Sequence, residues 1–152
     1  MNEGITGLDW RRESRMPLPP LLRQLMVAGR WRQPRDSVMF AAVPFLRDPV
    51  DFLLSEAGMR FESVGHGVGF SHMREYRGSE SEPRPLPWLD ADLSLFIAVN
   101  RKIGDDLGIE LDYRTSYTDP LVVASDWWTG DHTLHWREAF LTFSSFVTAL
   151  RL

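Results

Sequence analysis

The 152-residue sequence predicts an α+β domain: N-terminal helices, then an antiparallel meander sheet of about four to six strands, closed by a C-terminal helix. Two observations carry this prediction. Apolar residues recur at helical spacing over residues 18–26 and again over residues 143–150. Between these helices, β-prone runs are separated by turns too short to hold crossover helices, which favours antiparallel pairing. We expect residues 17–152 to form a single domain and residues 1–16 to be a flexible N-terminal arm.

Two short helices are expected near the N-terminus. Over residues 18–26 the leucines follow the i, i+3, i+4, i+7 spacing of one helical face, and prolines fit the first turn. Gly29 follows the last apolar position, where helices commonly end. A shorter helix is expected over residues 36–43, because Pro44 would limit it.

Asp48 and Pro49 predict the start of a third helix, since Asp is a good N-cap and proline fits the first helical position. Gly58 would end this helix, and the pattern then changes from helical to alternating. Short strands are therefore expected over residues 60–64 and 70–73, separated by a glycine-rich turn. The buried stripe of the third helix is expected to be Val50, Leu53, Leu54 and Ala57.

The C-terminal half predicts a loop, a run of strands and a last helix. Residues 77–87 are polar and proline-rich, which is typical of an exposed loop. Thr142 is the expected N-cap of the last helix. The strands are expected over residues 93–99, 109–114, 121–128 and 134–137.

Composition excludes several functional classes. The chain has no cysteine, so disulfide scaffolds, Cys-ligated zinc, iron–sulfur clusters and thiol nucleophiles are excluded. A net charge of −4 argues against a nucleic-acid binder, which would normally be basic. The N-terminus lacks the basic and apolar regions of a secretory signal, and no run of about 18 apolar residues is present. We expect a cytoplasmic protein with no membrane and no nucleic-acid partner.

The candidate chemical motifs each have a structural interpretation that we favour. The glycine-rich residues 65–69 are not followed by the helical period of a dinucleotide-binding fingerprint, so no cofactor is expected. His132 and His135 would point to opposite faces of a strand, so no metal site is expected. Glu110 and Asp112 lie about 7 Å apart along one strand face, within the range for shared acid/base work. A solvated sheet face produces the same pattern, so a hydrolase using this pair is only an alternative.

Acidic residues are concentrated in the stretch between Pro87 and Asp131, which contains nine acidic and three basic residues. This acidic stretch predicts either solvated turns and a solvated sheet face, or a surface that attracts a basic partner. Adjacent tryptophans in a strand point to opposite faces, so one of them could be an exposed anchor. The residues predicted for the partner-binding face are Asp105, Asp106, Glu110, Asp112, Asp126, Trp127 and Trp128.

The C-terminal half resembles the SUKH superfamily, which includes the yeast Smi and Knr cell-wall regulators and many bacterial relatives. The resemblance covers residues 86–152 and follows the order of the family's motifs. These are a glycine and acid turn at 104–106, a strand ending in Asp112-Tyr113, a Pro-led Val-rich strand from Pro120, a tryptophan, and a closing Phe-x-x-Phe-Val helix at 143–147. Residues 17–31 look like the opening helix of the family without its Leu-Pro-x-x-Tyr and Asn-Gly elements, and residues 32–85 match none of its motifs.

The resemblance implies a compact α+β domain that binds proteins and has no catalytic activity, cofactor or metal. Many bacterial members look like cytoplasmic immunity proteins that neutralise a cognate toxin, often a nuclease, by direct binding. The expected partner is therefore a toxin domain, and the protein is expected to be a monomer or a weak dimer. Because a nuclease site must hold a polyanion, an acidic face with an aromatic anchor suits it. A housekeeping adaptor or regulatory protein of the same fold is the alternative.

Overall fold

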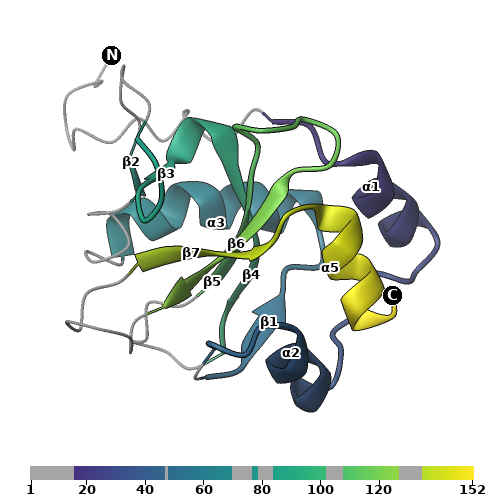
Figure 1. Ribbon diagram of the computed structural model, residues 1–152. Coiled ribbons are helices and arrows are strands. Elements are labelled where there is room, and N and C mark those ends of the chain that lie inside the picture. The colour runs from purple at the N-terminus through teal and green to yellow at the C-terminus, as the bar shows by residue number, and fades with distance from the viewer. Residues whose placement is uncertain (1–15, 47, 70–76, 79–83, 102–107, 127–134) are drawn as a thin grey trace.

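The protein has an α+β fold in which a five-stranded antiparallel sheet is covered by helices (Figure 1). This confirms the predicted fold class. The computed structural model describes residues 16–46, 48–69, 77–78, 84–101, 108–126 and 135–152. Within these ranges, only the backbone is described at residues 64–69, 77–78 and 126.

The sheet has the strand order β1-β4-β5-β6-β7, and all neighbouring strands are antiparallel. Four of its strands confirm the predicted C-terminal meander in the predicted order. The central strand β5 begins at Gly108. Glycine is needed there, because a Cβ at this position would lie 2.7 Å from the ring of Phe96 on the neighbouring strand. The strands are β1 (Val50–Phe52), β4 (Ser94–Asn100), β5 (Gly108–Asp112), β6 (Leu121–Asp126) and β7 (His135–Phe140).

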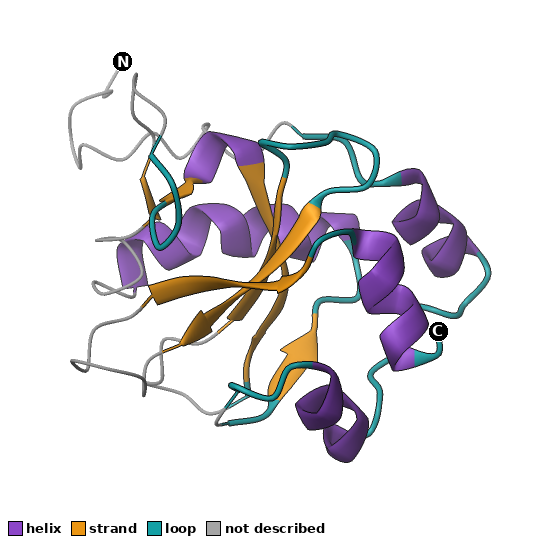
Figure 2. Ribbon diagram, in the orientation of Figure 1, coloured by secondary structure: helices purple, strands orange, loops and turns teal. Residues whose placement is uncertain are grey.

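Figure 2 shows the helices around this sheet, with α1, α2 and α5 on one side and the longer α3 running along β4. The loop predicted over residues 77–87 contains β2, which pairs in parallel with β3 in a separate two-stranded sheet. The helices are α1 (Pro20–Val27), α2 (Asp36–Ala42), α3 (Glu56–Gly69), α5 (Phe143–Leu150) and the short 3₁₀ helix η1 (Ala91–Leu93). The strands of the small sheet are β2 (Arg77–Gly78) and β3 (Leu89–Asp90).

Two buried clusters lie on opposite faces of the large sheet. The main core joins the sheet to α1, α2 and α5, and the predicted apolar positions of α1 and α5 enter it. Its largest contributors include Trp31, which stacks on Phe52 with ring centroids 4.1 Å apart. The second cluster contains Leu89, Phe96, Leu121, Val123 and Trp136.

The ends of α1 and α5 follow the predicted signals. Gly29 has a φ of 68°, which glycine adopts without strain, and it follows the last residues of α1. The hydroxyl of Thr142 accepts a hydrogen bond from the N–H of Ser145 (3.1 Å), which confirms Thr142 as the N-cap of α5.

The helix predicted over residues 48–58 is wrong, because residues 50–52 form β1. Val50 and Phe52 are buried and pair with Asn100 and Ala98 of β4. A helix here would leave these backbone groups of β4 without their strand partners. Pairing with β4 therefore outweighs the local start signal at Asp48.

The strand and glycine-rich turn predicted over residues 60–69 are also wrong, because α3 runs through them. The Ser55 hydroxyl accepts a hydrogen bond from the N–H of Gly58 (3.0 Å), as an N-cap does. Arg60 and Glu56 form an i, i+4 ion pair within the helix (3.4 Å). The strand predicted over residues 70–73 lies outside the described residues, as does most of the predicted N-terminal arm.

β1 is the edge strand on this side of the sheet, and it pairs only with residues 98–100 of β4. The rest of this side of β4 is held by other groups. Beyond the end of β1, the N–H of Leu53 donates to the carbonyl of Ile97 (2.8 Å). The N–H of Phe96 then donates to the hydroxyl of Ser63 on α3 (3.0 Å). A side chain of α3 thus replaces a strand partner at this edge.

Candidate partner-binding surface

The two carboxylates of β5 that we predicted on the partner-binding face are buried. Glu110 is 0% exposed and Asp112 is 2% exposed. The strand alternates as predicted, since its apolar residues enter the main core. The opposite face is covered too, by the second cluster around Leu89 and Trp136. The expectation that Glu110 and Asp112 lie on an accessible acidic face is therefore wrong.

Asp112 holds a guanidinium instead of facing solvent. Its carboxylate accepts from Nε (3.0 Å) and from a terminal nitrogen (2.8 Å) of Arg114. Arg114 in turn donates to the backbone carbonyls of Trp88 (3.2 Å) and Arg84. The guanidinium groups of Arg84 and Arg114 also lie 4.6 and 5.9 Å from the centre of the Trp88 ring. Asp112 thus anchors residues 84–88 to the sheet.

Further residues of the acidic stretch are also used within the domain. The carboxylate of Asp119 accepts from the N–H (2.8 Å) and the hydroxyl (2.7 Å) of Ser144 at the start of α5. The carboxylate of Asp90 accepts from the N–H of Asp92 (3.0 Å), which caps η1. Two further acidic residues of this stretch thus stabilise helix ends within the domain.

The other predicted residues of the partner-binding face are not brought together in the described structure. For Asp126 the structure describes only the backbone, at the end of β6. His135 lies in β7, and its sequence neighbour His132 is outside the described residues. The predicted face residues that also lie outside are Asp105, Asp106, Trp127 and Trp128.

An exposed apolar surface lies on α3 and the residue before its N-cap. Leu54 is 65% exposed, Phe61 is 72% exposed, and Ala57 between them is exposed. Ala57 and Phe61 are four residues apart within α3 and so lie on one side of the helix, and Leu54 precedes the N-cap Ser55. The apolar spacing continues in the sequence at Val64 and Val68, beyond the side chains that the structure describes. We call Leu54, Ala57 and Phe61 the α3 outer face.

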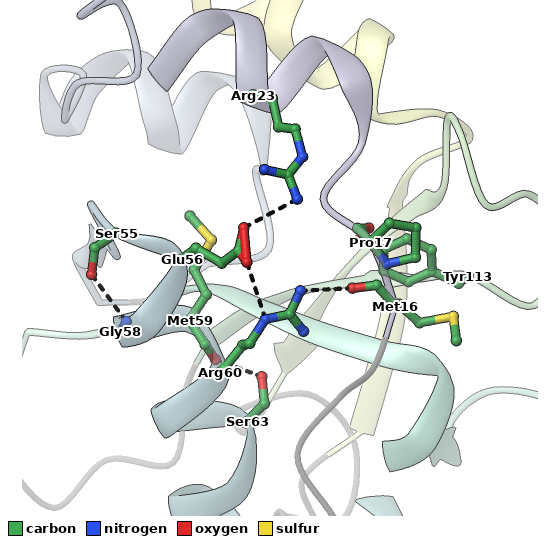
Figure 3. Close-up of polar contacts among 10 residues, drawn as sticks. All are labelled: Met16, Pro17, Arg23, Ser55, Glu56, Gly58, Met59, Arg60, Ser63 and Tyr113. Carbon is green, nitrogen blue, oxygen red and sulfur yellow. Dashed lines mark hydrogen bonds and ion pairs between the residues drawn. The ribbon is translucent and has the colours of Figure 1, made fainter. Parts of the chain in front are cut away.

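The side of α3 that faces the domain carries charged and polar groups (Figure 3). Glu56 pairs with Arg23 of α1 (3.2 Å) and with Arg60 (3.4 Å). Arg60 also donates to the carbonyl of Met16 (3.0 Å), close to where Tyr113 donates to the carbonyl of Pro17 (2.8 Å). α3 therefore contacts the domain through the fully buried Met59 and through these polar groups, while Ala57 and Phe61 face outward.

Burial raises the pKa of Tyr113 beneath this network, while the nearby Arg60 cation offsets part of the rise. A raised pKa keeps the phenol neutral, so that it continues to donate to Pro17 at ordinary pH. The residues around Tyr113 thus fix residues 16–17 against β5 and α3.

The α3 outer face was missed at the sequence level. We placed Leu54 and Ala57 on the buried stripe of a helix beginning at Asp48, whereas both are exposed. The signals that could have found the helix were Ser55 as N-cap and the spacing of apolar residues from Leu54 to Phe61. The glycines that follow obscured them, because glycine is unfavourable inside helices.

The described residues contain no helix that is long and apolar enough to cross a membrane. Among the same residues, no group of three or more His, Asp or Glu side chains is placed to hold a metal ion. Comparison of the chain with protein-family models, with curated proteins and with solved structures gives no match.

Proposed function

We propose that this chain is a non-catalytic protein-binding domain of SUKH type, a bacterial immunity protein that neutralises a toxin domain by direct binding. The observation that carries the proposal is the α3 outer face, where Leu54 and Phe61 are exposed by 65% and 72%. Large apolar side chains grouped on one side of a helix are typical of surfaces that another protein covers.

The way α3 is attached to the domain supports this interpretation. Met59 is fully buried in the main core, and Glu56 and Arg60 add ion pairs and hydrogen bonds. Ser63 also joins α3 to β4. Ala57 and Phe61 take no part in this attachment and are exposed. The apolar side is thus left for a partner. Phe61 has the size and exposure of an interface anchor.

The residues that carry the SUKH resemblance have structural roles here. Tyr113 at the end of the Asp112-Tyr113 motif is buried, and so are Phe143 and Phe146 of the closing helix. These residues therefore belong to the main core of the domain. The partner would be recognised by surface residues such as those of α3.

The neighbouring gene provides the first test. We expect the gene immediately upstream to encode a large toxin, and we expect its C-terminal domain to kill a bacterial host unless this chain is co-expressed. A chromosomal partner with no toxin gene nearby would favour the alternative, a housekeeping adaptor.

Substitutions on the α3 outer face then test the surface. Phe61→Asp and Leu54→Asp should abolish protection and weaken toxin binding by about 2 kcal/mol or more, which is about thirty-fold in Kd. Leu141→Asp is the matched control, because Leu141 is 71% exposed but lies between β7 and α5. Equal loss of protection in the control variant would reject α3 as the binding surface.

Electrostatic steering by the acidic stretch is tested separately. Asp105→Arg combined with Asp106→Arg should slow association at low salt and have less effect at high salt, because screening removes long-range attraction. Unchanged association rates would reject an acidic contribution while leaving the role of α3 intact. Asp112 is unsuitable for this test because it is buried.

A further inference from the structure

The two edges of the five-stranded sheet differ. At one end, the side chain of Gln33 donates to the carbonyl of Val50 (2.9 Å) and accepts from the N–H of Phe52 (2.6 Å), which closes the outer side of β1. The N–H of Phe96, in the part of β4 that β1 does not cover, donates to Ser63. At the other end, β7 pairs with β6 on one side only. Figure 1 shows β7 as the last strand, passing in front of the sheet.

Part of the outer row of backbone N–H and C=O groups on β7 could pair with a further strand. The N–H of Trp136 points away from β6 and donates to the carbonyl of Pro87 (3.4 Å). Because backbone groups alternate along a strand, the N–H of Glu138 points to the same outer side. Glu138 is exposed, and within the described part of the chain no strand pairs with β7 on this side.

A hollow of about 430 Å³ opens beside this row, and Trp136 forms part of its wall. Trp136 is 1% exposed, yet its indole N–H has no hydrogen-bond partner in the described structure. A buried donor without an acceptor is uncommon, because it loses its hydrogen bond to water without replacement. The hollow is lined by Leu86, Pro87, His135, Trp136, Arg137 and Glu138.

We propose that this edge binds an extended segment of a partner protein, which adds a strand beside β7 and places one apolar side chain in the hollow. A carbonyl of the segment accepts from the N–H of Glu138, as in other cases of strand addition.

Charge selects the sequence of the segment. The guanidinium of Arg137 lies 4.4 Å from the centre of the Phe45 ring, so the exposed Glu138 sets the charge preference. An antiparallel segment matches it best with a basic residue opposite Glu138. A second copy of the chain is a poorer occupant, because two-fold pairing centred on either residue places like charges opposite each other. This site is separate from the α3 outer face and does not depend on the proposed immunity function.

The probe is the capped peptide acetyl-Val-Lys-Glu-Val-amide, titrated into the full chain and followed by NMR. We expect saturable shifts of the Glu138 amide and of the Trp136 indole N–H. The charge-exchanged peptide acetyl-Val-Glu-Lys-Val-amide should bind about threefold more weakly. Absence of shifts at both protons would overturn the proposal. Shifts of the indole alone would also overturn it, since they would indicate a small-molecule pocket without strand addition.

Two variants at one position isolate the backbone contribution. Glu138→Pro removes the outer N–H without breaking a ladder bond to β6, because proline is tolerated on free edges. Peptide binding should be lost in Glu138→Pro and kept in Glu138→Gln, which retains the N–H but should lose the preference between the two peptides. Equal binding by the proline variant would reject strand addition.

Hydrogen exchange of the unsubstituted protein provides a measurement that does not depend on the folding of a variant. Saturating peptide should slow exchange of the Glu138 amide by about tenfold or more, because that N–H becomes hydrogen-bonded. Unchanged exchange would contradict the proposal. Dimerisation of the free protein through β7, measured by sedimentation, would identify a second copy as the occupant and also contradict it.

Discussion

At the scale of single residues, Asp112 shows what the alternation of a strand predicts about a side chain and what it does not predict. Alternation correctly predicts that Asp112 faces away from the main core, but it does not reveal whether the other face is covered. Residues 84–89 cover it, and this irregular segment has no periodic signal in the sequence. The same carboxylate that suggested a surface site is therefore an internal ion-pair partner of Arg114.

Asp112→Asn should lower the free energy of unfolding by about 3 kcal/mol, because it leaves the Arg114 guanidinium without its charged partner in a largely buried site. Urea denaturation measures the loss. Asp51→Asn is the control, because Asp51 pairs with the exposed Arg101 and should contribute little. Similar losses in the two variants would show that the Asp112 pair is not buried in solution.

Tyr113 predicts how stability depends on alkaline pH. Burial raises the pKa of Tyr113 in the folded state, so its contribution is fully present below the pKa of an exposed tyrosine and is lost as the pH rises above it. As the pH rises above about 10, the free energy of unfolding should fall more steeply in the original protein than in Tyr113→Phe. Tyr113→Phe should also lose about 1 kcal/mol at neutral pH through the missing bond to Pro17. Parallel pH profiles of stability in the two proteins would contradict a raised pKa of Tyr113 in the folded state.

At the scale of elements, α5 is fixed from two directions at its first turn. Thr142 caps it from within the chain, and Asp119 accepts two hydrogen bonds from Ser144 across the domain. The cap was predictable because it is local. The contact from Asp119 was not, since 25 residues separate it from Ser144 and sequence spacing does not report such contacts.

Thr142→Ala should reduce stability by about 1 kcal/mol through loss of the N-cap. Asp119→Ala should reduce it by about 2 kcal/mol, because a charged acceptor of two hydrogen bonds is removed. Thermal and urea unfolding measure both changes. Thr148→Ala, on the exposed side of α5, is the control and should change stability by no more than about 0.5 kcal/mol. If Thr148→Ala were as damaging as Asp119→Ala, docking by Asp119 would be rejected.

The contact between α3 and β4 predicts a specific weakness. Ser63→Ala removes the acceptor of the buried Phe96 N–H and should lower the free energy of unfolding by about 1–3 kcal/mol. Exchange of the Phe96 amide should accelerate more than that of Leu111 in the central strand. Equal acceleration at both amides would show that the variant acts only through global stability.

At the scale of the whole molecule, the sequence correctly predicted the helices and strands whose signals are local. It misassigned the elements that depend on contacts with residues far along the chain. α1, α2, α5 and β4–β7 have periods, caps and turns of their own, and these were predicted. β1 was missed because Val50 and Phe52 are ordered by β4, far along the chain. The candidate surface was missed for a related reason, since the exposure of Phe61 depends on which side of α3 the domain holds.

Sheet position predicts a gradient of amide protection. β5 lies between β4 and β6 and both of its faces are buried, so the amides of Ile109 and Leu111 should exchange only through global unfolding. In β7 the outward amide of Glu138 should exchange much faster than the inward amide of Arg137. Hydrogen-exchange NMR of the free protein measures both, and uniform protection along β7 would contradict an open edge.

Closure of the β4 edge by a side chain has a consequence for aggregation. When α3 opens locally, the N–H of Phe96 loses Ser63, and the part of β4 that β1 does not cover is presented to other molecules without any need for global unfolding. The opening free energy of α3, rather than the stability of the domain, therefore sets the concentration of the aggregation-prone species. A protein bound to the outer face of α3 would lower that concentration, and so act as a chaperone for the domain that it binds.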